Sequence, residues 1–166
     1  IAHLISIITE MYRTLTPTYK QHGSKHGLDV RTNLMIASAL SANVYLQSQK
    51  VSTRLLREVD TVMENVDMVL TPSTGLVAPQ IPQDALPDGN SDISTVIEIM
   101  RFSQPANLTG LPAISFPVGY DKKGLPIGMQ AIGRYWDETR ILGLALLSGK
   151  FVERRKPDVY FDILQN

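Results

Sequence analysis

The sequence predicts an α/β fold, and three observations lead to that prediction. Helical patterns of apolar residues occur three times within the first 66 residues and return near the C-terminal end. Between them lie three short apolar runs of the length that strands have. No apolar run reaches the roughly 20 residues that a membrane span requires. We therefore expect helices packed on a small sheet, with no internal boundary or repeat dividing residues 1–166.

Composition and charge exclude several classes of protein. The chain has 166 residues, 43% of them hydrophobic, with 16 basic and 16 acidic side chains and no Cys. Such a composition is typical of a globular domain rather than of a disordered or collagen-like chain. Zero net charge argues against a nucleic-acid partner, because a general binder needs an excess of basic side chains. The lack of Cys excludes disulfides and Cys-based zinc sites.

Three helices are predicted before residue 67. Apolar residues spaced by three and four predict a first helix of about 12 residues from Ile1, ended by Thr14, Pro17 and Gly23. Residues 28–40 predict a second helix with little charge, which we expect to be buried. Ser41 is a typical N-cap for a third, strongly amphipathic helix that continues to about residue 66.

The second half of the chain predicts three strands and two more helices. Residues 66–70 form a strand-like run, and the proline-rich stretch 75–92 is typical of a surface loop and includes Pro87. Ser91 or Asp92 caps a helix that ends near Pro105. Residues 111–120 and 125–132 then predict a hairpin, followed by a helix from Asp137. The strands are apolar on both faces, so we expect both faces to be covered.

Residue types that could carry chemistry do not form a recognisable arrangement. The chain has no G-x-S-x-G elbow, no phosphate-binding glycine loop and no H-E-x-x-H motif. His22 and His26 are four residues apart, but the adjacent glycines place them in a loop without a third metal ligand. These residues predict no metal site and no cofactor, and they leave the function open.

Several spaced motifs resemble the amidase signature family. The longest are Pro105-Ala106-Asn107-Leu108-Thr109-Gly110-Leu111-Pro112-Ala113-Ile114-Ser115-Phe116-Pro117-Val118-Gly119 and Gly124-Leu125-Pro126-Ile127-Gly128-Met129-Gln130-Ala131-Ile132-Gly133. The run 67–75 and the helix with Tyr45, Gln49 and Arg54 are also similar to segments of that family. Within the family, residues 119–126, 134–136 and 161–164 look most like the plant fatty acid amide hydrolases. The resemblance covers nearly the whole chain.

The resemblance implies a fold and a chemistry. Family members have a large α/β/α fold with a mixed β-sheet, of which this chain resembles the C-terminal portion. They hydrolyse amides with a Ser-cisSer-Lys triad, in which Lys acts as base and a Ser attacks the carbonyl. Those residues belong to the N-terminal half of family members, and no Lys of this chain has a matching context. We therefore expect no catalytic residue here and no activity of the chain by itself.

What this portion of the family contributes is the wall of the substrate pocket. The resemblance implicates the helix before the signature and the segment after its second strand, which here contain Met100, Arg101, Gln104 and Trp136. Thr71 and Pro72 follow a strand, where ligands bind in α/β sheets. Met35 is a weaker candidate. Family members that hydrolyse glutamine carry an acidic residue where Met100 falls, so Met100 favours an apolar substituent on the substrate.

The first hypothesis is a portion of a serine amidase that acts on N-acyl amides and resembles a fatty acid amide hydrolase. Its partners are a small acyl amide substrate and the missing N-terminal portion, since Ile1 begins inside a helical pattern without Met or a signal sequence. The alternatives are a non-catalytic ligand-binding or structural protein and an amidotransferase subunit. We expect an intracellular location, in the cytoplasm or at an internal membrane. A homodimer and peripheral membrane contact stay open.

Overall fold

The computed structural model describes residues 1–85, 90–153 and 155. Its elements are α1 (Ala2–His22), a short 3-10 turn (Gly23–Lys25), α2 (Leu28–Ser38), α3 (Ala42–Met63), β1 (Met68–Pro72), α4 (Ile93–Ile99), α5 (Gln104–Thr109), β2 (Ala113–Tyr120), β3 (Pro126–Gly133) and α6 (Glu138–Ser148). The predicted α/β class is confirmed. Pro87 of the predicted loop and the run 161–164 lie outside the described residues. In the described part of the chain, no helix has both the length and the hydropathy needed to cross a membrane.

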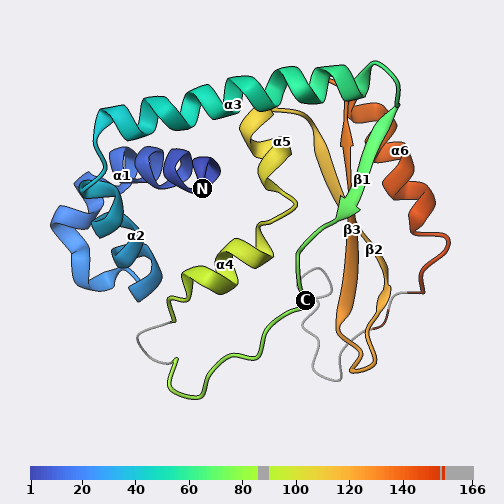
Figure 1. Ribbon diagram of the computed structural model, residues 1–166. Coiled ribbons are helices and arrows are strands. Elements are labelled where there is room, and N and C mark those ends of the chain that lie inside the picture. The colour runs from blue at the N-terminus through green and yellow to red at the C-terminus, as the bar shows by residue number, and fades with distance from the viewer. Residues whose placement is uncertain (86–89, 154, 156–166) are drawn as a thin grey trace.

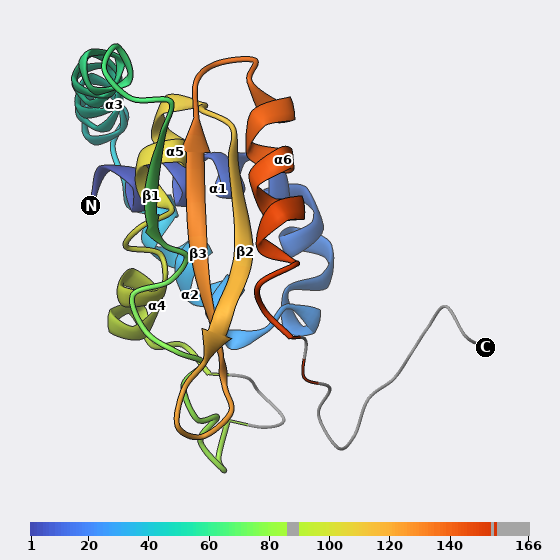
Figure 2. The same ribbon diagram turned by 90° about the vertical axis from the view of Figure 1, so that its right-hand side faces the viewer.

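The three strands form one sheet in the order β1-β3-β2, with β3 in the centre (Figure 2). Both pairings are antiparallel, and the Cα of Gln130 on β3 lies opposite Thr71 on β1 and Ser115 on β2. The predicted hairpin is confirmed, because β2 turns directly into β3. Asp121 closes that turn by accepting hydrogen bonds from the N–H groups of Lys123 and Leu125, each at 2.8 Å. Among the described residues the strands thus form only antiparallel pairs, whereas the resemblance implies a sheet that also contains parallel pairs.

Helices lie on both sides of the sheet. Figure 1 shows α6 on one side and α1, α2, α4 and α5 on the other, while α3 runs across one end. On the α5 side, Ile132 of β3 joins a buried cluster with Met63, Ala106 and Leu111. On the α6 side, Ile141 packs so closely on Gly133 that a Cβ there would lie 2.8 Å from the Ile141 Cγ2 atom.

Coverage of the strands differs from the sequence prediction. The second half of β3 is fully buried, as expected for a strand covered on both faces. Leu70 of β1 is 50% exposed, however, and Val118 of β2 is 37% exposed. The reason is that β1 and β2 are edge strands of this sheet, and the short helices α5 and α6 cover only part of its area. The apolar pattern predicts that all three strands are buried, but in the described part of the chain only the central strand β3 is well covered.

The first helix is longer than the sequence predicts. We expected about 12 residues, but α1 has 21 and contains Pro17 in its interior. Thr14 lies inside the helix, where its hydroxyl donates to the carbonyl of Glu10 one turn back, as that of Thr16 does to the carbonyl of Tyr12. Contacts along α1 with α2 and α3 offset the hydrogen bond that Pro17 cannot donate. The prediction of an early helix end was therefore wrong.

The predicted helix from Asp92 to Pro105 is two short helices. Asp92 is confirmed as the N-cap of α4, since its carboxylate accepts from the N–H groups of Ser94 and Thr95. The helix ends at Ile99, and a turn of residues 100–103 follows. We expected a helix to end near Pro105, but this residue lies in the first turn of α5. Its missing N–H costs nothing there, because the first N–H groups of a helix have no partner within the helix. This turn places the predicted pocket residues.

Polar side chains join α3 to its neighbours. Ser41 is confirmed as the N-cap of α3, accepting from the N–H of Val44 at 3.4 Å. Ser48 lies 3.1 Å from Ser6 of α1, and both are buried. The Ser52 hydroxyl donates to the Leu108 carbonyl at 2.6 Å, next to the end of α5. These contacts fix α1 and α5 against one face of α3.

Candidate functional site

The turn between α4 and α5 carries the centre of the candidate site. Backbone hydrogen bonds from Met100 to Val96 and from Arg101 to Glu98 end α4. The loop after β1 meets the same point, because the Gly75 N–H donates to the Glu98 carbonyl at 3.1 Å. A Cβ at position 75 would lie 2.2 Å from that carbonyl oxygen, so only glycine allows this approach. The loop after β1 and the α4–α5 turn are thereby held together.

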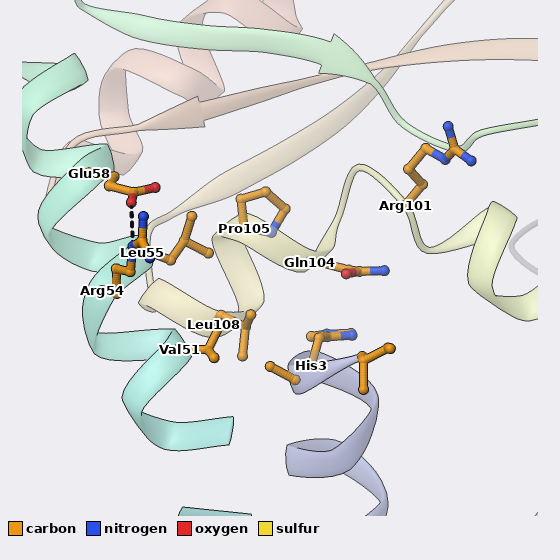
Figure 3. A pocket seen from close by; sticks show the side chains of 11 residues that line it. His3, Val51, Arg54, Leu55, Glu58, Arg101, Gln104, Pro105 and Leu108 are labelled. Atoms are coloured by element: carbon orange, nitrogen blue, oxygen red, sulfur yellow. Dashed lines mark hydrogen bonds and ion pairs between the residues drawn. The ribbon is translucent and has the colours of Figure 1, made fainter. Parts of the chain in front are cut away.

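A cavity of about 430 Å³ lies between α3, α5 and the start of α1 (Figure 3). Its lining is mixed, with apolar side chains that include Val51, Leu55 and Leu108, and we call it the polar cavity because it holds five polar side chains. Its polar side chains are those of His3, Arg54, Glu58, Arg101 and Gln104. Figure 3 shows Gln104 and His3 near its centre, with the Arg54–Glu58 ion pair at one end and Arg101 at the other. Arg101 is paired with Glu98 of α4. Each arginine thus has a carboxylate partner, and Gln104 and His3 are the hydrogen-bonding groups between the two ion pairs.

An apolar groove of about 280 Å³ lies between α1, α2 and α4. Its walls are lined by Leu4, Ile7, Ile8, Met11, Ile93, Val96 and Met100, with Asp29, Asn33, Asn90, Ser91 and Asp92 at its polar side. A smaller cavity of about 30 Å³ shares Leu4 and Met100 with the groove, and His3 and Gln104 with the polar cavity. Met100 and Gln104 therefore lie where an apolar and a polar space meet.

His3 is a polar member of this junction that the sequence did not single out as a site residue. It is 3% exposed, and its Nε2 atom lies 3.0 Å from the Asn107 side-chain amide of α5. Burial lowers the pKa of His3. Burial therefore favours the neutral imidazole, and the Asn107 amide already occupies one of its ring nitrogens.

The structure brings some of the predicted site residues together and leaves others apart. Met100, Arg101 and Gln104 line the two spaces. Thr71 bonds to Gln130, which also bonds to the Phe102 carbonyl in the turn beside them, and Pro72 is exposed at the end of β1. Met35 is 66% exposed on α2 and lines neither space. Its assignment to the pocket stays a prediction.

Trp136 lies outside these cavities, in the loop between β3 and α6. It is 92% exposed and has a φ of 63°, in the left-handed region that favours glycine. Tyr135 and Arg134 hold this loop by donating to the carbonyls of Thr109 and Val66, at 2.9 and 3.0 Å. The indole is therefore presented to solvent in a fixed loop, and its contact with substrate stays a prediction.

Comparisons with known proteins agree on one family. A family model described as amidase matches residues 4–142. The chain is similar to fatty acid amide hydrolases of Medicago truncatula and Arabidopsis thaliana, with 43% and 44% identity over 98% of this chain. It is also similar to a glutamyl-tRNA(Gln) amidotransferase subunit of Prochlorococcus marinus, with 40% identity over 77% of this chain. In each case the chain spans 27% of the relative's length.

Solved structures give the same fold. A crystal structure described as an amidase is 25% identical, with a TM-score of 0.68 over 83% of this chain and 32% of its own. A bacterial aryl acylamidase of the amidase signature family has a TM-score of 0.72 over 90% of this chain and 33% of its own, at 17% identity. The predicted amidase-signature α/β fold is therefore confirmed, and the place of this chain in the C-terminal part of that fold stays a prediction.

Proposed function

Because the chain belongs to the amidase family, we propose that it is part of a serine amidase that hydrolyses N-acyl amides, and that it forms the acyl-pocket wall. The fatty acid amide hydrolases of two plants match it over nearly its whole length. The observation that carries the proposal is the meeting of an apolar groove and a polar cavity at Met100 and Gln104. An N-acyl amide has the same two parts, a hydrocarbon chain and a polar amide.

The groove supplies the binding free energy for the acyl chain. Each CH₂ group that leaves water for an apolar wall contributes about 0.8 kcal/mol. Leu4, Ile7 and Val96 offer such a wall, with Met100 at its polar end. Gln104 and His3 then lie beside the position where the amide would be, as neutral hydrogen-bonding groups. This arrangement binds and orients the substrate, and it leaves the bond-breaking step to other groups.

The catalytic groups belong to the part of the amidase outside this chain. The family resemblance implies that a Ser attacks the amide carbonyl, the amine leaves with a proton, and water hydrolyses the acyl-enzyme. No residue of this chain is assigned to those steps. We therefore expect the chain by itself to have no amidase activity.

A chimera tests the proposal directly. The segment of the Arabidopsis thaliana relative that aligns with this chain is replaced by residues 1–166. Hydrolysis of a long-chain N-acyl amide and labelling by a fluorophosphonate probe are measured on the chimera and on the chain alone. We expect the chimera to hydrolyse the amide and to be labelled outside this chain. Labelling of the chain alone would refute the absence of a nucleophile, and a folded but inactive chimera would refute the proposed function.

An amidotransferase subunit is the second candidate, because the Prochlorococcus marinus protein matches 77% of this chain. Met100 distinguishes the two, since the resemblance implies an acidic residue there in family members that hydrolyse glutamine. The same chimera is therefore also assayed with glutamine. Hydrolysis of glutamine in preference to the long-chain amide would favour the amidotransferase. A non-catalytic ligand-binding or structural protein predicts a folded chimera without either activity.

A further inference from the structure

Gln130 is a buried polar residue at the centre of the sheet. It is 6% exposed and lies on β3 between the two edge strands. Its side-chain nitrogen Nε2 donates to the Phe102 carbonyl at 3.0 Å and to the Thr71 hydroxyl at 3.2 Å. Both N–H bonds of the amide are thereby used, one toward the α4–α5 turn and one toward the end of β1.

The chemistry of the partners fixes the orientation of this amide. The Phe102 carbonyl can only accept a hydrogen bond, so the nitrogen of Gln130 and not its oxygen faces the turn. The Thr71 hydroxyl accepts from Gln130 and donates to the Pro72 carbonyl at 3.0 Å. A chain of hydrogen bonds therefore runs from the turn through Gln130 to the peptide of Pro72.

Phe102 lies in the middle of the turn that carries the pocket residues. Met100 is two residues before it and Gln104 two residues after it. The Gln130 side chain thus bonds both to this turn and to the end of β1. These two segments lie far apart along the chain, and Gln130 is itself 28 positions from Phe102. An apolar residue at position 130 would leave the Phe102 carbonyl without its donor and free the turn to move.

We propose that Gln130 is a positioning residue that sets the geometry of the substrate groove by fixing the α4–α5 turn against the end of β1. The inference rests on the proposed function, because the groove is the site that the turn shapes. Gln130 does not itself line the polar cavity or the apolar groove. It acts through Met100 and Gln104, so its effect should depend on the length of the acyl chain.

The test uses the Arabidopsis chimera with Gln130→Met, which keeps the volume of the side chain but removes both donors. Ile141→Val is the matched control, because Ile141 is also buried but packs on the opposite face of β3. Thr71→Val removes only the hydrogen bond between Gln130 and Thr71, and it replaces Gln130→Met in the test if that variant does not fold. The kinetic readout is kcat/KM for a long-chain amide divided by kcat/KM for a short-chain amide.

We expect Gln130→Met to lower this ratio about tenfold, mainly through a higher KM for the long-chain substrate. Hydrogen exchange in residues 99–105 and 71–75 should rise in Gln130→Met and stay as in the wild type in Ile141→Val. Thr71→Val should lower the ratio by less than Gln130→Met, with faster exchange confined to residues 71–75.

Two results would overturn the inference. One is an unchanged ratio in a folded Gln130→Met or Thr71→Val chimera. The other is the same fall of the ratio in Ile141→Val at an equal loss of thermal stability, which would show a general effect of destabilisation. An inactive wild-type chimera would instead refute the proposed function, and hydrogen exchange would still decide whether Gln130 holds the two segments.

Discussion

Met100 is the residue on which the assignment of an apolar substrate depends. Its side chain lines both the apolar groove and the small cavity beside Gln104. In the chimera, Met100→Asp should lower kcat/KM for a long-chain amide by roughly tenfold or more, since burying a Met side chain is worth about 1.5–3 kcal/mol. Met100→Leu keeps the apolar wall and should stay within about twofold of the wild type. Unchanged kinetics of Met100→Asp would argue against a place in the pocket.

Gly75 determines whether the loop after β1 can reach α4. In Gly75→Ala the new Cβ would lie 2.2 Å from the Glu98 carbonyl oxygen, which is backbone and cannot rotate away. We expect a loss of about 1–3 kcal/mol in the free energy of unfolding, measured with urea. Gly143→Ala is the control, because beyond the neighbouring helix backbone no atom of the described residues lies within 4 Å of the added Cβ. Within helix α6 that change should stabilise by about 0.5–1 kcal/mol.

If Gly75→Ala unfolds at the same urea concentration as the wild type, the close contact between the loop and Glu98 is not made in solution. The same measurement on Gly143→Ala shows whether the method resolves a change of the opposite sign. The pair therefore separates a backbone clash from the general effect of adding a methyl group.

At the level of elements, helix α4 depends on its N-cap because it has only seven residues. Hydrogen bonds, first from the Ser94 side chain and then from Thr95, lower the pKa of Asp92 from 3.8 to about 2. Since the folded pKa lies below the unfolded value, the cap stabilises the helix above about pH 4. That stabilisation is lost as the pH falls toward 2.

The prediction is a pH-dependent difference in Tm between wild type and Asp92→Ala. The difference should be largest above pH 4 and should shrink as the pH approaches 2. Ser41→Ala removes the neutral N-cap of α3 and should lower Tm by an amount that does not change over this range. A difference for Asp92→Ala that is constant from pH 5 to pH 2 would contradict the role of the charged carboxylate.

At the level of the whole molecule, α6 has one buried and one exposed face. Ile141 is 4% exposed, whereas Leu146 is 76% exposed and Leu142 is 57% exposed. In the chain alone, Ile141→Ala should cost about 2–5 kcal/mol of unfolding free energy, and Leu146→Ala should stay within about 0.5 kcal/mol. Urea unfolding of both variants checks this contrast.

The chimera extends this prediction to the longer protein. The chain spans 27% of the length of its fatty acid amide hydrolase relatives, so most of a relative's surface lies outside it. If the remainder packs on α6, Leu146→Ala should become destabilising in the chimera by about 1–3 kcal/mol. An equal and small effect in both proteins would show that the outer face of α6 stays in solvent.

Features that depend on neighbours along the chain could be predicted from the sequence. The repeats of apolar residues predict the helices and the hairpin, because side chains on one face follow the geometry of the backbone. The N-caps Ser41 and Asp92 are local signals in the same way, since each bonds to N–H groups two or three residues ahead. Met100, Arg101 and Gln104 were implicated by the family resemblance, and they lie close together because only five positions of the chain, at the α4–α5 turn, contain all three.

The sequence by itself thus determined the fold class and the family, and it predicts the segment of the candidate pocket. The tertiary structure decided which distant residues contact that segment and helix α5. His3 meets Asn107 across 104 positions, and Gln130 meets Phe102 across 28. It also decided that α1 continues through Pro17 and that Pro105 begins a helix rather than ending one. The physical reason is that these outcomes depend on packing and hydrogen bonds between elements, which local periodicity does not encode.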